Sequence, residues 1–166
     1  MNDHLIRDLA DSDHDGLWWM LKPVFRAGDT YAIDSDISRD AALGYWTGPG
    51  RRVFALLDQG QMVGSYYIVR NQAGGGAHVC NCGFVTDPAA RGRGVARAML
   101  DHALETARAT GFRAMQFNFV VSSNTRAVAL WERAGFDVVG RLPQAFLHPE
   151  KGYVEALVMY KTLRAD

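Results

Sequence analysis

Residues 82–97 read Cys-Gly-Phe-Val-Thr-Asp-Pro-Ala-Ala-Arg-Gly-Arg-Gly-Val-Ala-Arg, and the interpretation of the whole chain depends on this stretch. A strand-like run ends in a turn, and Arg-Gly-Arg-Gly then opens a long helical pattern. The first turn of a helix carries unpaired N–H groups and a partial positive charge, and glycines let a ligand approach the backbone closely. The stretch therefore predicts an anion site suited to a pyrophosphate, with Arg91, Arg93 and Arg97 adding charge around it.

Three nucleotide-binding patterns compete for this stretch. A Walker loop needs Gly-Lys-Ser or Gly-Lys-Thr, and neither follows here. A dinucleotide fingerprint needs a third small residue where Arg97 stands, and it belongs near the start of a parallel sheet. The pattern Arg/Gln-x-x-Gly-x-Gly/Ala matches at every position from Arg91 to Ala96. The alternative without a ligand is an ordinary glycine-rich helix start.

Length, composition and net charge limit the classes of protein to which the chain can belong. Its 166 residues, 48% of them apolar, suit one domain over residues 1–166. Eighteen basic residues balance eighteen acidic ones, which argues against a general electrostatic grip on nucleic acid. Neither a signal peptide nor a membrane-spanning run is expected. Cys80 and Cys82, which lack clustered metal-ligand partners, read as core residues in a reducing compartment, so we expect a cytoplasmic protein without a metal site.

Periodicity and turn signals give an order of seven strands and four helices. Pro23 is expected to bend or shorten the first helix, and Ser122 or Ser123 to cap the last one. Residues 142–152 are expected to be a loop. The strands are expected at residues 5–9, 53–57, 62–69, 77–86, 114–121, 136–139 and 153–160. The first helix is expected to end at about Phe25, and the second to begin after Ser38. The third is expected over residues 92–110, and the fourth includes residues 127–134.

This order resembles that of the GNAT superfamily of acetyl-CoA-dependent N-acetyltransferases, and the resemblance covers nearly the whole chain. Residues 124–136, Asn-Thr-Arg-Ala-Val-Ala-Leu-Trp-Glu-Arg-Ala-Gly-Phe, look like the family's second motif, Asn-x-x-Ala-x-x-Leu-Tyr-x-x-x-Gly-Phe. The resemblance implies an α/β (α+β) fold with one mixed, mostly antiparallel seven-stranded sheet. The sheet is splayed at its centre, and about four helices cover both faces.

The resemblance also implies how acetyl-CoA is bound. Backbone amides from Arg91 to Ala96, and that of Arg97, would hold the pyrophosphate, and the backbone of Phe84 and Val85 would pair with the pantetheine arm. The side chain of Asn124 would bond the same arm, a role compatible with capping a helix. The expected cofactor-binding residues are Phe84, Val85, Arg91, Gly92, Arg93, Gly94, Val95, Ala96, Arg97 and Asn124.

Gly83 and Trp131 bear on the chemistry. Gly83 stands where the family's strand carries a bulge, which would aim an N–H at the thioester carbonyl and stabilise the oxyanion. Trp131 replaces a tyrosine that in many relatives protonates the leaving thiolate. Indole has no usable acid proton, so another group or water supplies the proton, or none is needed because a thiol pKa near 8.5 makes thiolate a fair leaving group. The alternative is that Trp131 fills the core stripe of its helix.

The acceptor is less defined. One asparagine lies on each splayed strand, Asn81 on the first and Asn118 on the second. This pair and the string Phe-Asn-x-Val-x-x-x-Asn are similar to those in N-acetyltransferases that act on proline analogues such as azetidine-2-carboxylate. In those enzymes the matching asparagines are implicated in substrate binding. We expect Asn81, Asn118 and Gly83 to be catalytic. The alternative for each asparagine is that the strand backbone supplies the hydrogen-bond partners of its side chain and no substrate is bound. Tyr31, Phe146 and His148 are further substrate-binding candidates, and His148 is also a candidate general base.

The leading hypothesis is therefore an N-acetyltransferase that uses acetyl-CoA and a small amine or amino acid in a ternary complex. Acetylation of a protein or peptide is the runner-up among enzymes. A GNAT module that binds acetyl-CoA without turnover is the hypothesis of another class. Family habit suggests a homodimer, and neither nucleic acid nor membrane is an expected partner.

Overall fold

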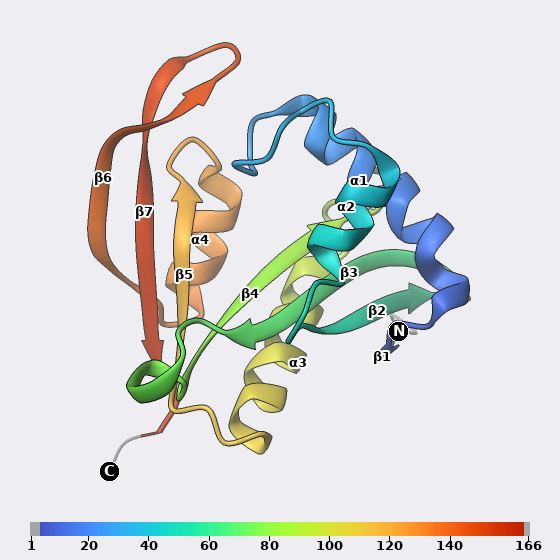
Figure 1. Ribbon diagram of the computed structural model, residues 1–166, viewed down its shortest axis with the longest axis horizontal. Helices are drawn as coiled ribbons and strands as arrows, with labels where there is room; N and C mark the ends of the chain where they lie inside the picture. Colours follow the sequence, from blue (N-terminus) through green and yellow to red (C-terminus); the bar gives the residue numbers. More distant parts are fainter. Residues whose placement is uncertain (1–3, 165–166) are drawn as a thin grey trace.

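In the computed structural model, which describes residues 4–164, one seven-stranded sheet has the strand order β1-β2-β3-β4-β5-β7-β6 (Figure 1). Among the described strands, β4 and β5 form the parallel pair and every other neighbouring pair is antiparallel. The strands are β1 (His4–Asp8), β2 (Arg52–Asp58), β3 (Gln61–Arg70), β4 (Val79–Thr86), β5 (Ala114–Val121), β6 (Asp137–His148) and β7 (Gly152–Thr162).

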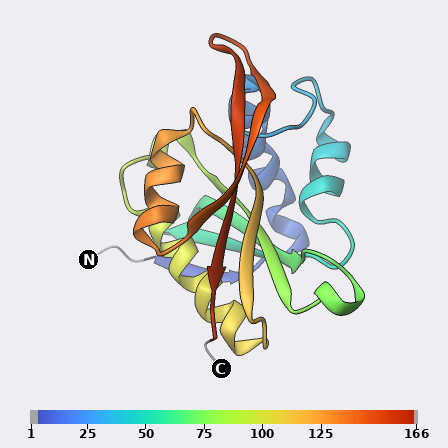
Figure 2. The same cartoon turned by 90° about the vertical axis from the view of Figure 1, so that its left-hand side faces the viewer.

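Helices cover both faces of this sheet (Figure 2). They are α1 (His14–Ala27), α2 (Arg39–Trp46), α3 (Val95–Ala109) and α4 (Thr125–Arg133). The helices α3 and α4 bury their apolar stripes on one face, around Met99, Leu100 and Trp131, and α1 and α2 pack on the other, around Leu21 and Trp46. The expected fold class, a mixed and mostly antiparallel sheet with four helices, is confirmed.

The sheet is splayed between β4 and β5. These strands pair only at Val79–Ala114 and Cys80–Met115, and beyond those two pairs they separate. The neighbouring ladders continue, because β4 stays paired with β3 up to Thr86 and β5 stays paired with β7 up to Val121. The separation therefore opens one edge of β4 in the middle of the sheet.

Several expected boundaries are wrong. The helix α1 continues past Pro23 to Ala27, and α3 begins at Val95 rather than at residue 92. Asn124, not Ser122 or Ser123, is the N-cap of α4, and its side chain accepts a bond from the Ala127 N–H at 3.4 Å. Residues 142–148, expected in a loop, belong to β6, whose register shifts between Leu142 and Phe146.

The described part of the chain contains no helix long and apolar enough to cross a membrane. Within residues 4–164 there is also no group of three or more His, Cys, Asp or Glu side chains that could hold a metal ion.

A tyrosine and a histidine pair under α3. The Tyr66 hydroxyl lies 2.7 Å from Nδ1 of His102, and the Tyr66 ring stacks on Phe54. Burial lowers the pKa of His102, while the charge of Glu105 acts in the opposite direction. The folded chain therefore binds this proton less tightly than the unfolded chain does.

We expect the free energy of unfolding to decrease as the pH falls through about 6.5, the ordinary histidine value. His102→Gln should remove part of this pH dependence, since glutamine still reaches the Tyr66 hydroxyl but does not titrate. Denaturant melts of both proteins between about pH 5 and pH 8 measure the effect. Equal slopes in the two proteins would contradict the assignment to His102.

Candidate active site

The loop after β4 has the backbone shape of an anion cradle. Gly92 and Gly94 both have positive φ angles, 78° and 79°, and Gly94 is the N-cap of α3. The first bond inside the helix runs from the Ala98 N–H to the Gly94 carbonyl at 3.0 Å, so the amides of residues 95–97 belong to the open first turn. The Arg93 N–H, by contrast, donates to the Ala90 carbonyl at 3.3 Å. Two glycines in the left-handed backbone conformation, next to the N-terminus of a helix, orient successive backbone N–H groups toward one point.

The arginines of this loop differ from one another. The Arg93 guanidinium pairs with the nearly buried carboxylate of Asp58, and Arg97 pairs with Asp101 at 2.9 Å. Arg91 is exposed at the start of the loop. Arg93 and Arg97 are therefore engaged with carboxylates in this structure, and the contribution of the three arginines to a phosphate site stays a prediction.

The gap between β4 and β5 is lined by backbone groups of alternate residues. The Asp87 N–H donates to the Val63 carbonyl and the Asn71 N–H donates to the Val79 carbonyl, each at 2.9 Å, so the odd-numbered residues of β4 bond β3. The N–H and C=O of Phe84 therefore point into the gap.

Gly83 and Val85 have the opposite orientation. Their backbone groups turn toward β3, and the ladder between β3 and β4 runs from residue 80 to residue 86 without a register shift. The expected bulge at Gly83 is thus absent from this ladder, and the Gly83 N–H does not face the gap. A bulge lies instead in β5, between Phe117 and Val120. The predicted pairing groups of Val85 are likewise engaged with β3.

Gly83 is needed for a packing reason. Tyr67 lies directly opposite it on β3, and a Cβ built at residue 83 would be 2.4 Å from the Tyr67 ring. Real Cβ contacts are not that short, so any side chain here would displace the ring. Tyr67 consequently leans across β4 on the face covered by α1 and α2.

Tyr31 closes the same face of the gap. This residue lies in the α1–α2 connection, and its hydroxyl donates to the Phe84 carbonyl at 2.6 Å. Burial raises the pKa of Tyr31 well above its ordinary value, so the phenol stays protonated and remains a donor. This substrate-binding candidate is therefore bonded to the strand edge that would receive a ligand.

Trp131 fills the opposite face of the gap. Its ring centroid is 5.2 Å from that of Phe84 on β4 and 4.8 Å from that of Phe117 on β5. Its side chain is 8% exposed. Trp131 thus holds the two separated strands apart as part of the core.

The two predicted asparagines share one face. Cys80, Cys82 and Phe117 lie in the core beneath α3 and α4, so Asn81 and Asn118, which alternate with them, face the α1–α2 side. The side-chain amide of Asn118 is already engaged: its Nδ2 donates to Oδ1 of Asn71 at 2.6 Å, and its Oδ1 accepts from Nε2 of Gln116 at 2.9 Å. Asn118 is also exposed, and its bonds to Asn71 and Gln116 are to side chains, not to the strand backbone.

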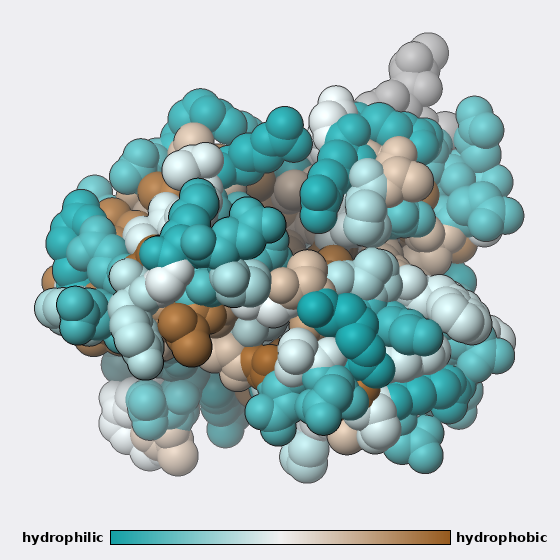
Figure 3. All heavy atoms as spheres, turned by 90° about the horizontal axis from the view of Figure 1, so that it is seen from above, coloured by the Kyte–Doolittle hydropathy of each residue, from teal (hydrophilic) through white to brown (hydrophobic). Residues whose placement is uncertain are grey.

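A groove of about 510 Å³ lies between the α1–α2 connection and the β6–β7 hairpin. Tyr31 lines one side, and Phe146, whose ring packs on Phe119, lines the other. Seen from above, the surface is hollowed between the part built on β6 and β7 and the part built on α1 and α2 (Figure 3). The structure therefore brings Tyr31 and Phe146 to one groove.

His148 has a structural position instead. Its ring is buried at the hairpin turn, and its Nδ1 accepts from the N–H groups of Glu150 and Lys151 at 3.1 and 3.2 Å. Nδ1 is thereby occupied, and the side chain is not among those lining the groove. These turn amides bind the nitrogen that would take the proton, which argues against a general base here, and a substrate-binding role of His148 stays a prediction.

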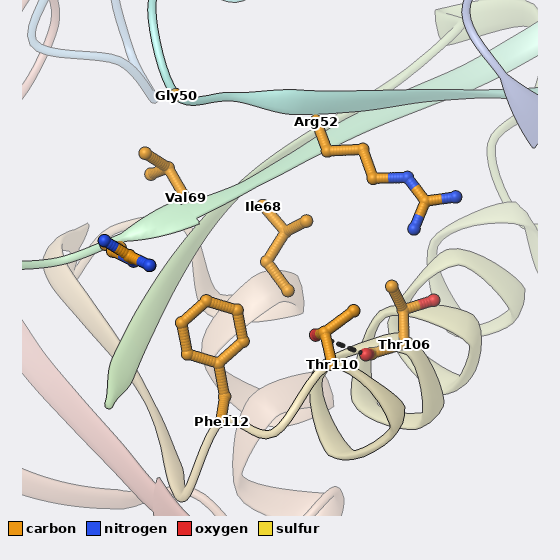
Figure 4. A pocket seen from close by; sticks show the side chains of 8 residues that line it. Gly50, Arg52, Ile68, Val69, Thr106, Thr110 and Phe112 are labelled. Carbon is orange, nitrogen blue, oxygen red and sulfur yellow. Dashed lines mark hydrogen bonds between the residues drawn. The ribbon is translucent and has the colours of Figure 1, made fainter. Parts of the chain in front are cut away.

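A second cavity of about 360 Å³ lies at the far end of α3 (Figure 4). Ile68, Phe112 and the Thr106–Thr110 pair line it, and the Thr110 hydroxyl donates to the Thr106 carbonyl at 2.7 Å. None of the predicted site residues lines this cavity, so the groove and the β4–β5 gap are the candidate site.

Comparisons with known proteins agree with this arrangement. Residues 15–136 match the family described as Acetyltransferase (GNAT). The N-acetyltransferase aca1 of Schizosaccharomyces pombe is 30% identical over 159 residues, covering 86% of this chain and 76% of that protein. The structure of a GCN5-related N-acetyltransferase from Kribbella flavida is 40% identical, with a TM-score of 0.91 over 96% of this chain and 97% of that one.

A more distant structure, a GNAT superfamily phosphinothricin acetyltransferase from Sinorhizobium meliloti in complex with AcCoA, shares the fold. It is 20% identical, with a TM-score of 0.83 over 96% of this chain and 88% of that one.

Gly94→Leu should weaken CoA binding by roughly tenfold or more, because the side chain would displace a phosphate and several amide hydrogen bonds would be lost. Gly111→Leu is the matched control. Gly111 has a φ of 93°, and its Cβ would meet nothing within 4 Å, so both variants bear a similar backbone strain at opposite ends of α3. Calorimetry compares them. Equal CoA affinity in the two variants would contradict the cradle.

Trp131→Phe should lower the free energy of unfolding by about 1 kcal/mol or more through lost packing, and most turnover should remain. Chemical denaturation and steady-state kinetics on the same preparation measure both quantities. If turnover fell about a thousandfold while the fold and CoA affinity were intact, Trp131 would have a chemical role that its packing does not explain.

Proposed function

The chain belongs to the GNAT family of acetyl-CoA-dependent N-acetyltransferases, and we propose that it transfers the acetyl group to the amine of a small molecule, an amino acid or an analogue of one. One observation carries this proposal. The open edge of β4 leads into the amide cradle, and Phe84 on that edge accepts a hydrogen bond from Tyr31, which lines the groove. A bound thioester and an acceptor amine would meet in that gap.

The residues present fit acetyl-CoA. The left-handed glycines Gly92 and Gly94 and the open first turn of α3 would hold the pyrophosphate, and the Phe84 backbone would pair with the pantetheine arm. Asn124 keeps its side chain at the start of α4, where capping and a contact to the arm are compatible. When bound, acetyl-CoA supplies an activated acetyl group.

Direct attack by the amine is part of the proposal, because the cysteines cannot carry an acetyl group. Cys80 and Cys82 are buried under α3, and burial raises the pKa of the Cys82 thiol well above its ordinary value. A buried protonated thiol is a poor nucleophile. The Phe84 N–H, which faces the gap, replaces Gly83 as the backbone donor proposed to stabilise the oxyanion.

The groove supports a small acceptor. Its walls, which include Tyr31 and Phe146, come from two separate segments that border an open groove of about 510 Å³, a volume in the range of small-molecule sites. Asn81 and Asn118 face the same side of the sheet and are proposed to flank the acceptor. The proposal also includes a cytoplasmic location and a homodimer. The dimer would cover the exposed β6 edge around Val139.

Release of free thiol from acetyl-CoA in the presence of small amines, amino acids and peptides tests this function. We expect turnover with an amino acid or analogue. Turnover with peptides alone would favour protein acetylation, and tight CoA binding without any turnover would favour a module that only binds acetyl-CoA.

Asn118→Ala should raise the acceptor KM by about threefold to tenfold, because one hydrogen bond to the substrate is lost, and CoA affinity should stay the same. Asn71→Ala is the control, since it removes the protein partner of Asn118 without removing the Asn118 amide. Kinetics and thermal melting separate the roles. A lower Tm with an unchanged KM in both variants would restrict Asn118 to structure.

A further inference from the structure

Arg51 is held in a fixed position on the acceptor face of the sheet. It lies one residue before β2, and one terminal nitrogen donates to the Tyr45 carbonyl. Its guanidinium lies 4.0 Å from the ring centroid of Tyr67 and 4.4 Å from that of Tyr45. Two aromatic rings and one hydrogen bond therefore fix a planar cation whose other donors remain to be used.

The aromatic support of Arg51 reaches to the gap. Tyr67 leans over Gly83 on β4, the residue before Phe84, and its hydroxyl is 3.5 Å from that of Tyr45. Burial raises the pKa of Tyr67 and of Tyr31, and in both cases the positive charge of Arg51 acts in the opposite direction. The cation is thus within electrostatic reach of the two phenols that border the acceptor side.

Arg51, unlike the next residue Arg52, has no carboxylate partner among the described residues. Arg52 bonds Asp8 at 2.8 Å, and Arg93 and Arg97 also pair with acids. Arg51 is only partly exposed, and a partly buried cation is costly to leave without an anion. A guanidinium with unused parallel donors is suited to a carboxylate.

We propose that Arg51 binds the carboxylate of the acceptor, so that the substrate is an amine with a carboxylate close to the nitrogen, as in an amino acid. This inference rests on the proposed small-molecule N-acetyltransferase. Arg51 does not line the groove beside Tyr31, so the acceptor would extend past Tyr31 toward it. The carboxylate would accept from the unused in-plane N–H donors of Arg51, and the neutral amine would point toward the gap at Phe84. Arg51 is then a specificity-determining residue that positions the amine and takes no part in proton transfer.

The test compares kcat/KM for an amino acid with kcat/KM for its carboxamide, which keeps the amine and loses the negative charge. The wild-type protein should prefer the acid by roughly 10- to 100-fold, the range of a charge-assisted contact. Arg51→Met should reduce this preference to within about threefold, chiefly through the acid's KM. Arg51→Lys keeps the positive charge but loses the paired guanidinium donors, so its preference for the acid should be intermediate. This variant still tests the inference if the methionine variant does not fold.

Arg52→Met is the matched control, because Arg52 also lies over an aromatic ring, Phe54 at 4.7 Å, but pairs with Asp8. It should keep the full preference, and CoA affinity should be unchanged in all variants. If the wild-type protein prefers the acid and folded Arg51 variants keep that preference, or lose acid and carboxamide activity equally, the inference is wrong and the proposed function stands. If the wild-type protein acetylates only amines without a carboxylate, the acceptor class and the inference both fail.

Discussion

The structure depends on one constraint, that β4 and β5 can pair for only two residues before they separate. A strand edge left open inside a sheet has N–H and C=O groups that need partners. On one face Trp131 fills the space between the strands, and on the other the Tyr31 hydroxyl bonds the Phe84 carbonyl. The acceptor side and the core side are therefore both organised around the same short stretch of backbone.

Local sequence was enough to predict what local chemistry determines. The strand, turn and glycine-rich helix start of residues 82–97 fold as an anion cradle because positive φ angles at Gly92 and Gly94 are accessible to glycine alone at little cost. Trp131 was also predictable as a core residue, since its spacing from Ala127 and Ala134 is helical. Seven strands and four helices followed from the same kind of pattern.

The predictions that were wrong depended on contacts between strands that are distant in the sequence. The phase of the β3–β4 ladder decides that Phe84, and not Gly83, faces the gap, and a one-residue change of phase is invisible in the residues themselves. Residues 142–148 lack the alternation of a half-buried strand because β6 is an exposed edge, and Pro143 reads as a turn. Arg51 follows Gly48-Pro49-Gly50 and belongs to no motif, so the sequence does not mark it, although its spacing from Val53 places both on one face.

The contact between Gly83 and Tyr67 has an evolutionary consequence. Any side chain at residue 83 excludes the Tyr67 ring, and without that ring the Arg51 cation loses one of its two aromatic supports. Three positions on three different segments are thus mutationally epistatic. With Arg51 in the role proposed for it, a change at one of these positions alters the selective value of the other two, so drift at Gly83 is constrained by a guanidinium that it never touches.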